Sequence, residues 1–152
     1  MPLALAALSA NLTRLKRCRL GKSFAMTKPT SSRESVFDLM CITSNGKGGF
    51  HYVMKLTISY YSKRYKKHVI AIKGDQFDGA TGALDIDSRG WIFHDVLCRD
   101  GCFSDGTPCS NWQASTVLSD ILKDEGRWFR GRTWFAATWL FGGGKARKNG
   151  MI

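Results

Sequence analysis

The densest group of potentially reactive side chains in this 152-residue chain lies between Phe77 and Cys98. A glycine-rich loop, DGATG at 78–82, is followed by an acidic turn and by an apolar run that contains the adjacent pair His94 and Asp95. Glycines let backbone carbonyls approach a ligand closely, and Ca²⁺ takes oxygen ligands from carbonyls and carboxylates. We therefore expect the loop to face a helix that bears Asp95, with calcium between them as one hypothesis.

In this hypothesis the loop and calcium residues are Asp78, Gly79, Gly82 and Asp95. Successive helical residues point about 100° apart, so His94 is expected on a different side of the helix from Asp95. There it could act as general base on a water polarised by the metal. The alternative needs no cofactor: the glycines form a tight turn, and His94 is a hydrogen-bonded interior histidine.

Nearby cysteines permit a second metal hypothesis. His94 and Cys98 stand at positions i and i+4 of the expected helix, and Cys102 and Cys109 follow in a loop. Imidazole and thiolate are zinc ligands, but this spacing matches no standard zinc motif; in the alternative, Cys98 is a small core residue. The five cysteines include no CxxC pair, so a complete disulfide framework is not expected and a reducing compartment fits better.

The formal net charge of +11 makes an anionic partner plausible, either nucleic acid or a lipid surface, although a generally basic protein has the same balance. No apolar run reaches the roughly eighteen residues of a membrane-spanning helix. The basic residues expected to bind the partner lie in an N-terminal arm, a hairpin tip and a C-terminal tail: Arg14, Lys16, Arg17, Arg19, Lys63, Arg64, Lys66, Lys67, Lys145, Arg147 and Lys148.

The expected elements predict one α+β domain over residues 34–144, between a basic N-terminal arm at 1–33 and a basic tail at 145–152. The arm contains no acidic residue, and its apolar start permits an amphipathic helix, with a disordered arm as the alternative. Runs of β-branched and aromatic residues separated by turns predict a small antiparallel meander, with strands over 36–42, 51–61 and 67–73.

Three packed helices are expected after the meander. The first begins at Ser88 as N-cap, the second spans about 111–125 with Ser110 as its N-cap, and the third spans 127–141. The positions expected in the core between the last two helices are Val117, Leu118, Trp134 and Leu140.

The motifs from Asp78 to Gly144 resemble a family of small phage-encoded proteins, the domain of unknown function 1353. The runs DGATG, DIDSRGWIFHDVLC, QASTVLSDILKDEG and WFRGRTWFAATWLFGGG follow the order of that family's glycine loop, His-Asp helix, Ala-Asp-x-x-Phe helix and aromatic helix. The resemblance covers a little under half of the chain. It implies a phage or prophage source, and hence the virion or the cytoplasm of an infected bacterial cell. It leaves the activity open, because the family has no settled function.

The same order of loop and helix is similar to that of the secreted calcium-dependent phospholipases. This resemblance implies loop carbonyls and Asp95 as calcium ligands, and His94 as the base. Two positions depart from the pattern: Cys98 replaces a tyrosine, and Ser115 stands where an aspartate orients the histidine. Without that carboxylate the charged form of the histidine loses its stabilisation.

The sequence thus predicts a non-catalytic phage accessory or virion-associated protein that contacts nucleic acid or other virion proteins, with a membrane surface as a further anionic partner. The alternative is a calcium-dependent lipid hydrolase, in which His94, Asp95 and Ser115 are the catalytic residues.

Overall fold

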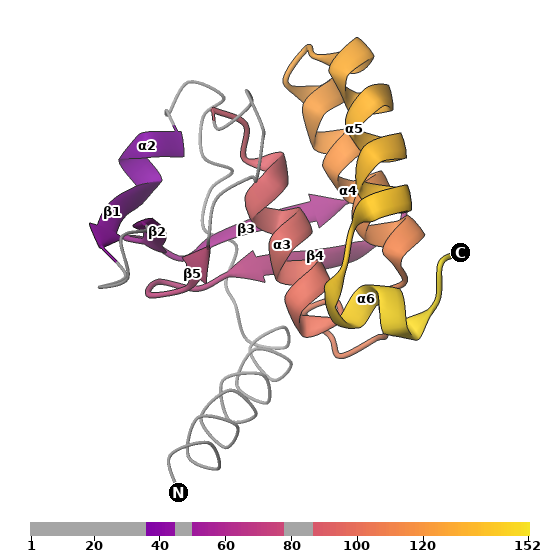
Figure 1. The fold of residues 1–152 in the computed structure, drawn as a ribbon, viewed down its shortest axis with the longest axis horizontal. Coiled ribbons are helices and arrows are strands. Elements are labelled where there is room, and N and C mark those ends of the chain that lie inside the picture. The colour runs from indigo at the N-terminus through magenta and orange to yellow at the C-terminus, as the bar shows by residue number, and fades with distance from the viewer. Residues whose placement is uncertain (1–35, 45–49, 78–86) are drawn as a thin grey trace, which may run out of the picture.

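The computed structural model of the chain describes residues 36–44, 50–77 and 87–152. It confirms the α+β fold, because antiparallel strands in two small sheets precede four packed helices (Figure 1). The basic arm at 1–33 and the glycine loop at 78–82 lie outside the described residues.

The strands form two sheets rather than one meander. The first sheet has the order β1-β2-β5 and comprises β1 (Met40–Ser44), β2 (Phe50–Met54) and β5 (Gln76–Phe77). The second comprises β3 (Ile58–Ser62) and β4 (Lys67–Ala71). All these pairs are antiparallel.

Two of the expected strands are interrupted. The segment expected as a strand at 36–42 begins as a short helix, α2 (Val36–Leu39), and the expected strand at 51–61 breaks between β2 and β3. At this break the Lys55 amide donates to the Leu39 carbonyl, and the Met54 amide donates to the Asp75 carbonyl. These bonds extend the β1-β2 and β2-β5 pairings by one residue, and the chain leaves the first sheet after Lys55.

The helices are α3 (Gly90–Asp100), α4 (Asn111–Asp124), α5 (Trp128–Phe141) and α6 (Gly144–Asn149). Helix α3 contacts α4, α6 and β4, whereas α5 packs mainly on α4 (Figure 1). Gly90, at the start of α3, lies against Leu118, and the amide of Arg89 just before α3 donates to Glu125 just after α4, so these two helices are antiparallel. None of the helices in the described ranges is long and apolar enough to span a membrane.

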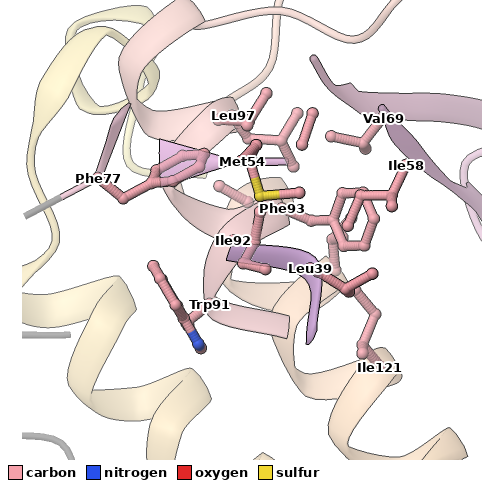
Figure 2. Packing of buried hydrophobic residues seen from close by; sticks show 14 of the residues in the cluster. Leu39, Met54, Ile58, Val69, Phe77, Trp91, Ile92, Phe93, Leu97 and Ile121 are labelled. Atoms are coloured by element: carbon pink, nitrogen blue, oxygen red, sulfur yellow. The ribbon is translucent and has the colours of Figure 1, made fainter. Parts of the chain in front are cut away.

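The core surrounds α3, between this helix, the strands and α4. Figure 2 shows Ile92 and Phe93 of α3 among side chains from the strands, including Met54 and Ile58. Trp91 meets the rings of Tyr52 and Phe77 edge-on, with centroids 5.8 and 5.7 Å away. Burial of these large side chains provides the main driving force for folding.

The expected core between the last two helices is only partly confirmed. Val117 and Leu118 of α4 are buried, but Trp134 is only partly buried and Leu140 is 49% exposed. The expectation for Leu140 is therefore wrong. Helix α5 lies at the edge of the domain and has one buried residue, Gly131, which packs against the backbone of α4.

The expected cap of α4 is confirmed as a capping box. The Gln113 amide donates to Ser110 Oγ at 3.2 Å, and the Ser110 amide donates to Gln113 Oε1 at 2.9 Å. Ser88 is not the N-cap residue of α3, because the helix begins at Gly90 with Arg89 before it. The Ser88 hydroxyl nevertheless accepts a hydrogen bond from the Gly90 amide at 3.0 Å.

The segment 145–152 was expected as a basic tail outside the domain, and the structure corrects this expectation. It contains most of α6, whose Ala146 is fully buried. Asn149 Nδ2 donates to the carbonyls of Gly101 and Cys109, at 2.6 and 3.0 Å. The Trp139 indole donates to the Met151 carbonyl at 2.8 Å. These anchors are dispersed among basic residues, so composition alone did not indicate them.

A glycine pair before α6 provides a matched test of this packing. Gly144 has φ of 84°, and a Cβ there would overlap the carbonyl oxygen of Cys98. Gly143 is extended and has open space around it. We expect Gly144→Ala to lower the free energy of unfolding by more than about 2 kcal/mol, because the left-handed conformation alone costs roughly 1–2 kcal/mol. Gly143→Ala should change it by less than about 0.5 kcal/mol. Urea denaturation measures both, and equal effects would contradict the packing of Gly144 on α3.

Candidate functional site

Three side chains of α3 form a polar cluster around His94. His94 is 7% exposed, with Nδ1 3.3 Å from Asp95 Oδ1 and Nε2 3.4 Å from Cys98 Sγ. Helical geometry explains the second contact, because Cys98 follows His94 by one turn and lies above the same face. A thiol, an imidazole and a carboxylate are therefore arranged in series on one helix.

The orientation of Asp95 differs from the expectation. We expected His94 and Asp95 to face different sides of the helix, whereas the carboxylate of Asp95 bends toward the imidazole. The Asp95 side chain is 37% exposed, so it bridges the buried histidine and the solvent. Asp95 thus orients His94, a role for which the phospholipase resemblance implied a residue on the next helix.

The electrostatics of the cluster favour a charged histidine. Burial lowers the pKa of His94, but hydrogen bonds to Asp95 and Cys98 and the charges of these groups outweigh burial and raise the pKa to about 9. His94 is then an imidazolium at neutral pH. A general base must be unprotonated, so this state suits a counter-ion or proton donor better than a base acting on water.

Ser115 is fully buried on α4, and its hydroxyl has no hydrogen-bond partner within the described ranges. The antiparallel register that sets Gly90 against Leu118 places Ser115 at about the level of His94. The phospholipase resemblance implies an orienting aspartate at this position of the sequence. Within the described residues, however, its hydroxyl makes no hydrogen bond to His94.

The calcium hypothesis stays a prediction, because Asp78, Gly79 and Gly82 lie outside the described residues. Helix α3 itself presents Asp95 to the histidine. Any contribution of this carboxylate to a calcium site would therefore compete with its bond to His94.

The zinc hypothesis gains no support. Within the ranges that the structure describes, no group of three or more His, Cys, Asp or Glu side chains could hold a metal ion. The four residues proposed as ligands, His94, Cys98, Cys102 and Cys109, are all described. Cys109 instead donates to the Ser110 carbonyl at 3.3 Å, and burial raises the pKa of its thiol to about 12. A zinc ligand must be a thiolate, so this environment opposes metal binding.

The hairpin tip is less available to a partner than its sequence indicates. Arg64 binds both carboxylate oxygens of Asp120, at 2.9 and 3.1 Å. Lys67 Nζ lies 2.5 Å from Asp105 Oδ2 and 2.8 Å from Thr107 Oγ1. Two of the four basic residues of the tip are thus paired within the domain, whereas Lys63 and Lys66 are exposed.

A second set of exposed cations and aromatic rings lies on α5 and α6, and of these only Lys145 and Lys148 were expected from the sequence to bind a partner. No Asp or Glu occurs from Gly126 to Ile152. The residues that we group as the α5–α6 surface are all exposed: Trp128, Phe129, Arg130, Arg132, Phe141, Lys145 and Lys148. Exposure is 55% for Trp128, 72% for Phe129 and 84% for Phe141. Two features of the sequence could have indicated this surface: the absence of acidic residues after Glu125, and apolar residues on all sides of α5.

Two local features organise the beginning of this surface. The Arg132 guanidinium lies over the Trp128 ring, 4.9 Å from its centroid. An open hollow of about 470 Å³ is lined by the segment 126–130, which includes Arg127, Phe129 and Arg130. Arg127 also binds the Asp87 carboxylate through two nitrogens, at 2.6 and 2.5 Å. Cations and exposed aromatic rings therefore adjoin in one shallow depression.

Comparisons of the chain with family models, with curated proteins and with solved structures gave no match. The functional argument therefore depends on the chemistry of the α3 cluster and of the α5–α6 surface.

The charge of His94 can be tested by NMR titration of its imidazole. We expect a midpoint near pH 9, against about 6.5 for an ordinary histidine. Because the pKa is raised in the folded state, the cluster stabilises the fold fully below pH 6.5 and loses this contribution as the pH rises through about 9. Asp95→Asn should shift the midpoint down, since it removes the partner charge. A midpoint below 6.5 in the unmodified protein would contradict this account of the cluster.

The same cluster predicts the absence of phospholipase activity. A charged His94 and a serine at position 115 leave no oriented neutral base, so we expect no calcium-dependent release of fatty acid from phospholipid vesicles. Ser115→Asp is the informative variant, because it should create or raise activity if the scaffold is a hydrolase that lost its carboxylate. Calcium-dependent hydrolysis by the unmodified protein, abolished in His94→Gln, would show that the prediction is wrong.

Proposed function

We propose that the protein is a non-catalytic phage accessory or virion-associated protein that binds nucleic acid, in the virion or in the infected cell. The observation that carries the proposal is the α5–α6 surface, where aromatic rings and cations are exposed together in a segment without acids. The motif order over 78–144 supports the phage source, and the hairpin tip and N-terminal arm are secondary contributors of charge.

The exposed aromatic rings favour a surface that binds a partner. A helix at the edge of a domain normally turns its apolar side chains inward, but only Gly131 is buried on α5. Large apolar groups left in water mark interaction surfaces. Bases of a single strand stack on aromatic rings whatever their sequence, and this stacking contributes about 1–3 kcal/mol per base. Trp128 and Phe129 are placed to offer such rings.

The cations of the surface favour a polyanion as the partner. Arg130 and Arg132 adjoin the exposed rings in sequence, and Lys145 and Lys148 add exposed positive charge on α6. Each cation that neutralises a phosphate releases counter-ions, so binding weakens steeply with salt. The surface therefore fits a single-stranded nucleic acid, with the rings on the bases and the cations on the backbone.

The binding test is titration of a fluorescent single-stranded oligonucleotide at several salt concentrations. We expect affinity with little sequence preference, and a logarithmic salt slope of about −0.7 for each phosphate contacted. The double variant Lys145→Gln, Lys148→Gln should reduce the magnitude of the slope by about 1–2. Lys55→Gln, an exposed cation on the turn after β2, is the matched control and should leave the slope unchanged.

The contribution of stacking is tested separately from charge. Phe129→Ala should weaken binding by about 1–3 kcal/mol, roughly 5–150-fold, at every salt concentration. Leu56→Ala removes another exposed apolar side chain, from the turn after β2, and should leave the affinity for the oligonucleotide unchanged. Flat salt dependence would exclude nucleic acid. Flotation with anionic liposomes, without binding to the oligonucleotide, would assign the surface to a membrane instead.

The virion part of the proposal has its own test. Mass spectrometry of purified particles should detect the protein if it is packaged, in a fixed ratio to a structural protein of the particle. Its presence only in the lysate of infected cells would assign it to the cytoplasm.

A further inference from the structure

We propose that Cys98 is a nucleophilic thiol, activated by His94 and positioned through Asp95, that accepts an acyl group from an activated ester or thioester. This inference goes beyond nucleic-acid binding and does not depend on it. The product is a stoichiometrically modified protein, S-acylated at Cys98.

The geometry has the three parts of an activated nucleophile in sequence. Cys98 Sγ lies 3.4 Å from His94 Nε2, and His94 Nδ1 lies 3.3 Å from Asp95 Oδ1. A nucleophile within hydrogen-bond reach of an imidazole, itself oriented by a third group, is the arrangement by which proteins activate cysteine. The roles follow from contact: Cys98 attacks, His94 holds the proton, and Asp95 fixes and stabilises the imidazolium.

The surroundings of the other described cysteines set Cys98 apart. Cys109 is fully buried and Cys102 is nearly so. Cys41 is exposed, but its thiol faces the Val53 carbonyl at 3.7 Å. Cys98 is partly exposed and contacts an imidazole. A reagent can therefore reach Cys98, and the imidazole can activate its thiol. Cys41 is an internal control, because a reagent can reach it but no imidazole contact is recorded for it within the described residues.

The position of Cys98 on the helix makes its dependence on His94 strong. The residue lies in the last turn of α3, which ends at Asp100. The carbonyl end of a helix disfavours a negative charge and favours a positive one. The helix therefore opposes a thiolate at Cys98 and supports an imidazolium at His94. Activation of Cys98 therefore depends on its contact with His94 and not on the helix.

The chemistry balances with the groups at hand. In the reacting form Cys98 and His94 share one proton, which His94 Nε2 holds while the sulfur adds to the carbonyl carbon of the acyl donor. The new bond is S–C, and the C–O or C–S bond of the donor breaks. The departing alkoxide or thiolate takes the proton from the imidazolium, which leaves neutral His94 and an acyl thioester on Cys98. Attacker and proton donor, the two groups that this transfer requires, are thus supplied by one turn of α3.

The first test measures alkylation of the native full-length chain by iodoacetamide at pH 6.5, with each cysteine followed by peptide mass spectrometry. An ordinary thiol is only about 1% thiolate at this pH, so we expect Cys98 to react at least about tenfold faster than the more exposed Cys41. His94→Gln should remove this advantage, and Asp95→Asn should reduce it. A rate at Cys98 equal to or below that at Cys41 overturns the proposal.

The second test uses p-nitrophenyl acetate as the acyl donor. We expect a burst of about one nitrophenolate per chain and an acetyl group on Cys98. Cys98→Ser should abolish the burst, and Cys41→Ser should leave it unchanged. Circular dichroism establishes that each variant is folded. If His94→Gln does not fold, two results decide the outcome: the effect of Asp95→Asn, and the ratio of the alkylation rates of Cys98 and Cys41 in the unmodified protein. Acetylation spread over several cysteines, or a burst that persists in Cys98→Ser, overturns the proposal.

Discussion

The burial of α3 is the constraint on which the rest of the structure depends. Eight of its eleven residues are buried, so the helix must be enclosed on more than one side. The strands cover the face with Ile92 and Phe93, α4 lies along a second side, and α6 closes a third. Polar side chains inside this enclosure need partners. His94 finds them on its own helix, in Asp95 and Cys98, which is why the reactive cluster and the core share one element.

Local signals in the sequence were sufficient for the fold class, for α4 and α5 to within a residue or two, and for the capping box at Ser110. They were insufficient wherever a distant part of the chain decides the outcome. The first sheet depends on pairing of β2 with β1 and with β5, which is far along the chain, and the bonds of Lys55 and Met54 end these pairings. Helix α6 depends on carbonyls of Gly101 and Cys109 that accept from Asn149. Among the described elements α5 packs mainly on α4, and Leu140 stays 49% exposed.

For the candidate site, residue types and spacing identified His94, Asp95 and Cys98 but not their mutual roles. The i to i+4 spacing of histidine and cysteine permitted a zinc hypothesis, with Cys98 as a small core residue as the alternative, whereas the structure shows a contact between thiol and imidazole. The direction of the Asp95 side chain was not predictable from helical periodicity, because a rotamer can turn an adjacent carboxylate back onto the ring. Likewise, four cations at the hairpin tip indicated a binding site, and only tertiary structure showed that Asp105 and Asp120 neutralise two of them.

The ion pair between Arg127 and Asp87 has a thermodynamic consequence. Asp87 is the first described residue after the glycine-rich segment, and Arg127 also lines the hollow at the start of α5. One guanidinium cannot give both of its bidentate edges fully to a carboxylate and to an incoming phosphate. An anion held by Arg127 must therefore compete with Asp87. A ligand that strengthens the bond between Asp87 and Arg127 must in turn lower the affinity for the anion by the same factor. Binding of an anion in the hollow at the start of α5 and the position of Asp87 are thus thermodynamically linked through Arg127.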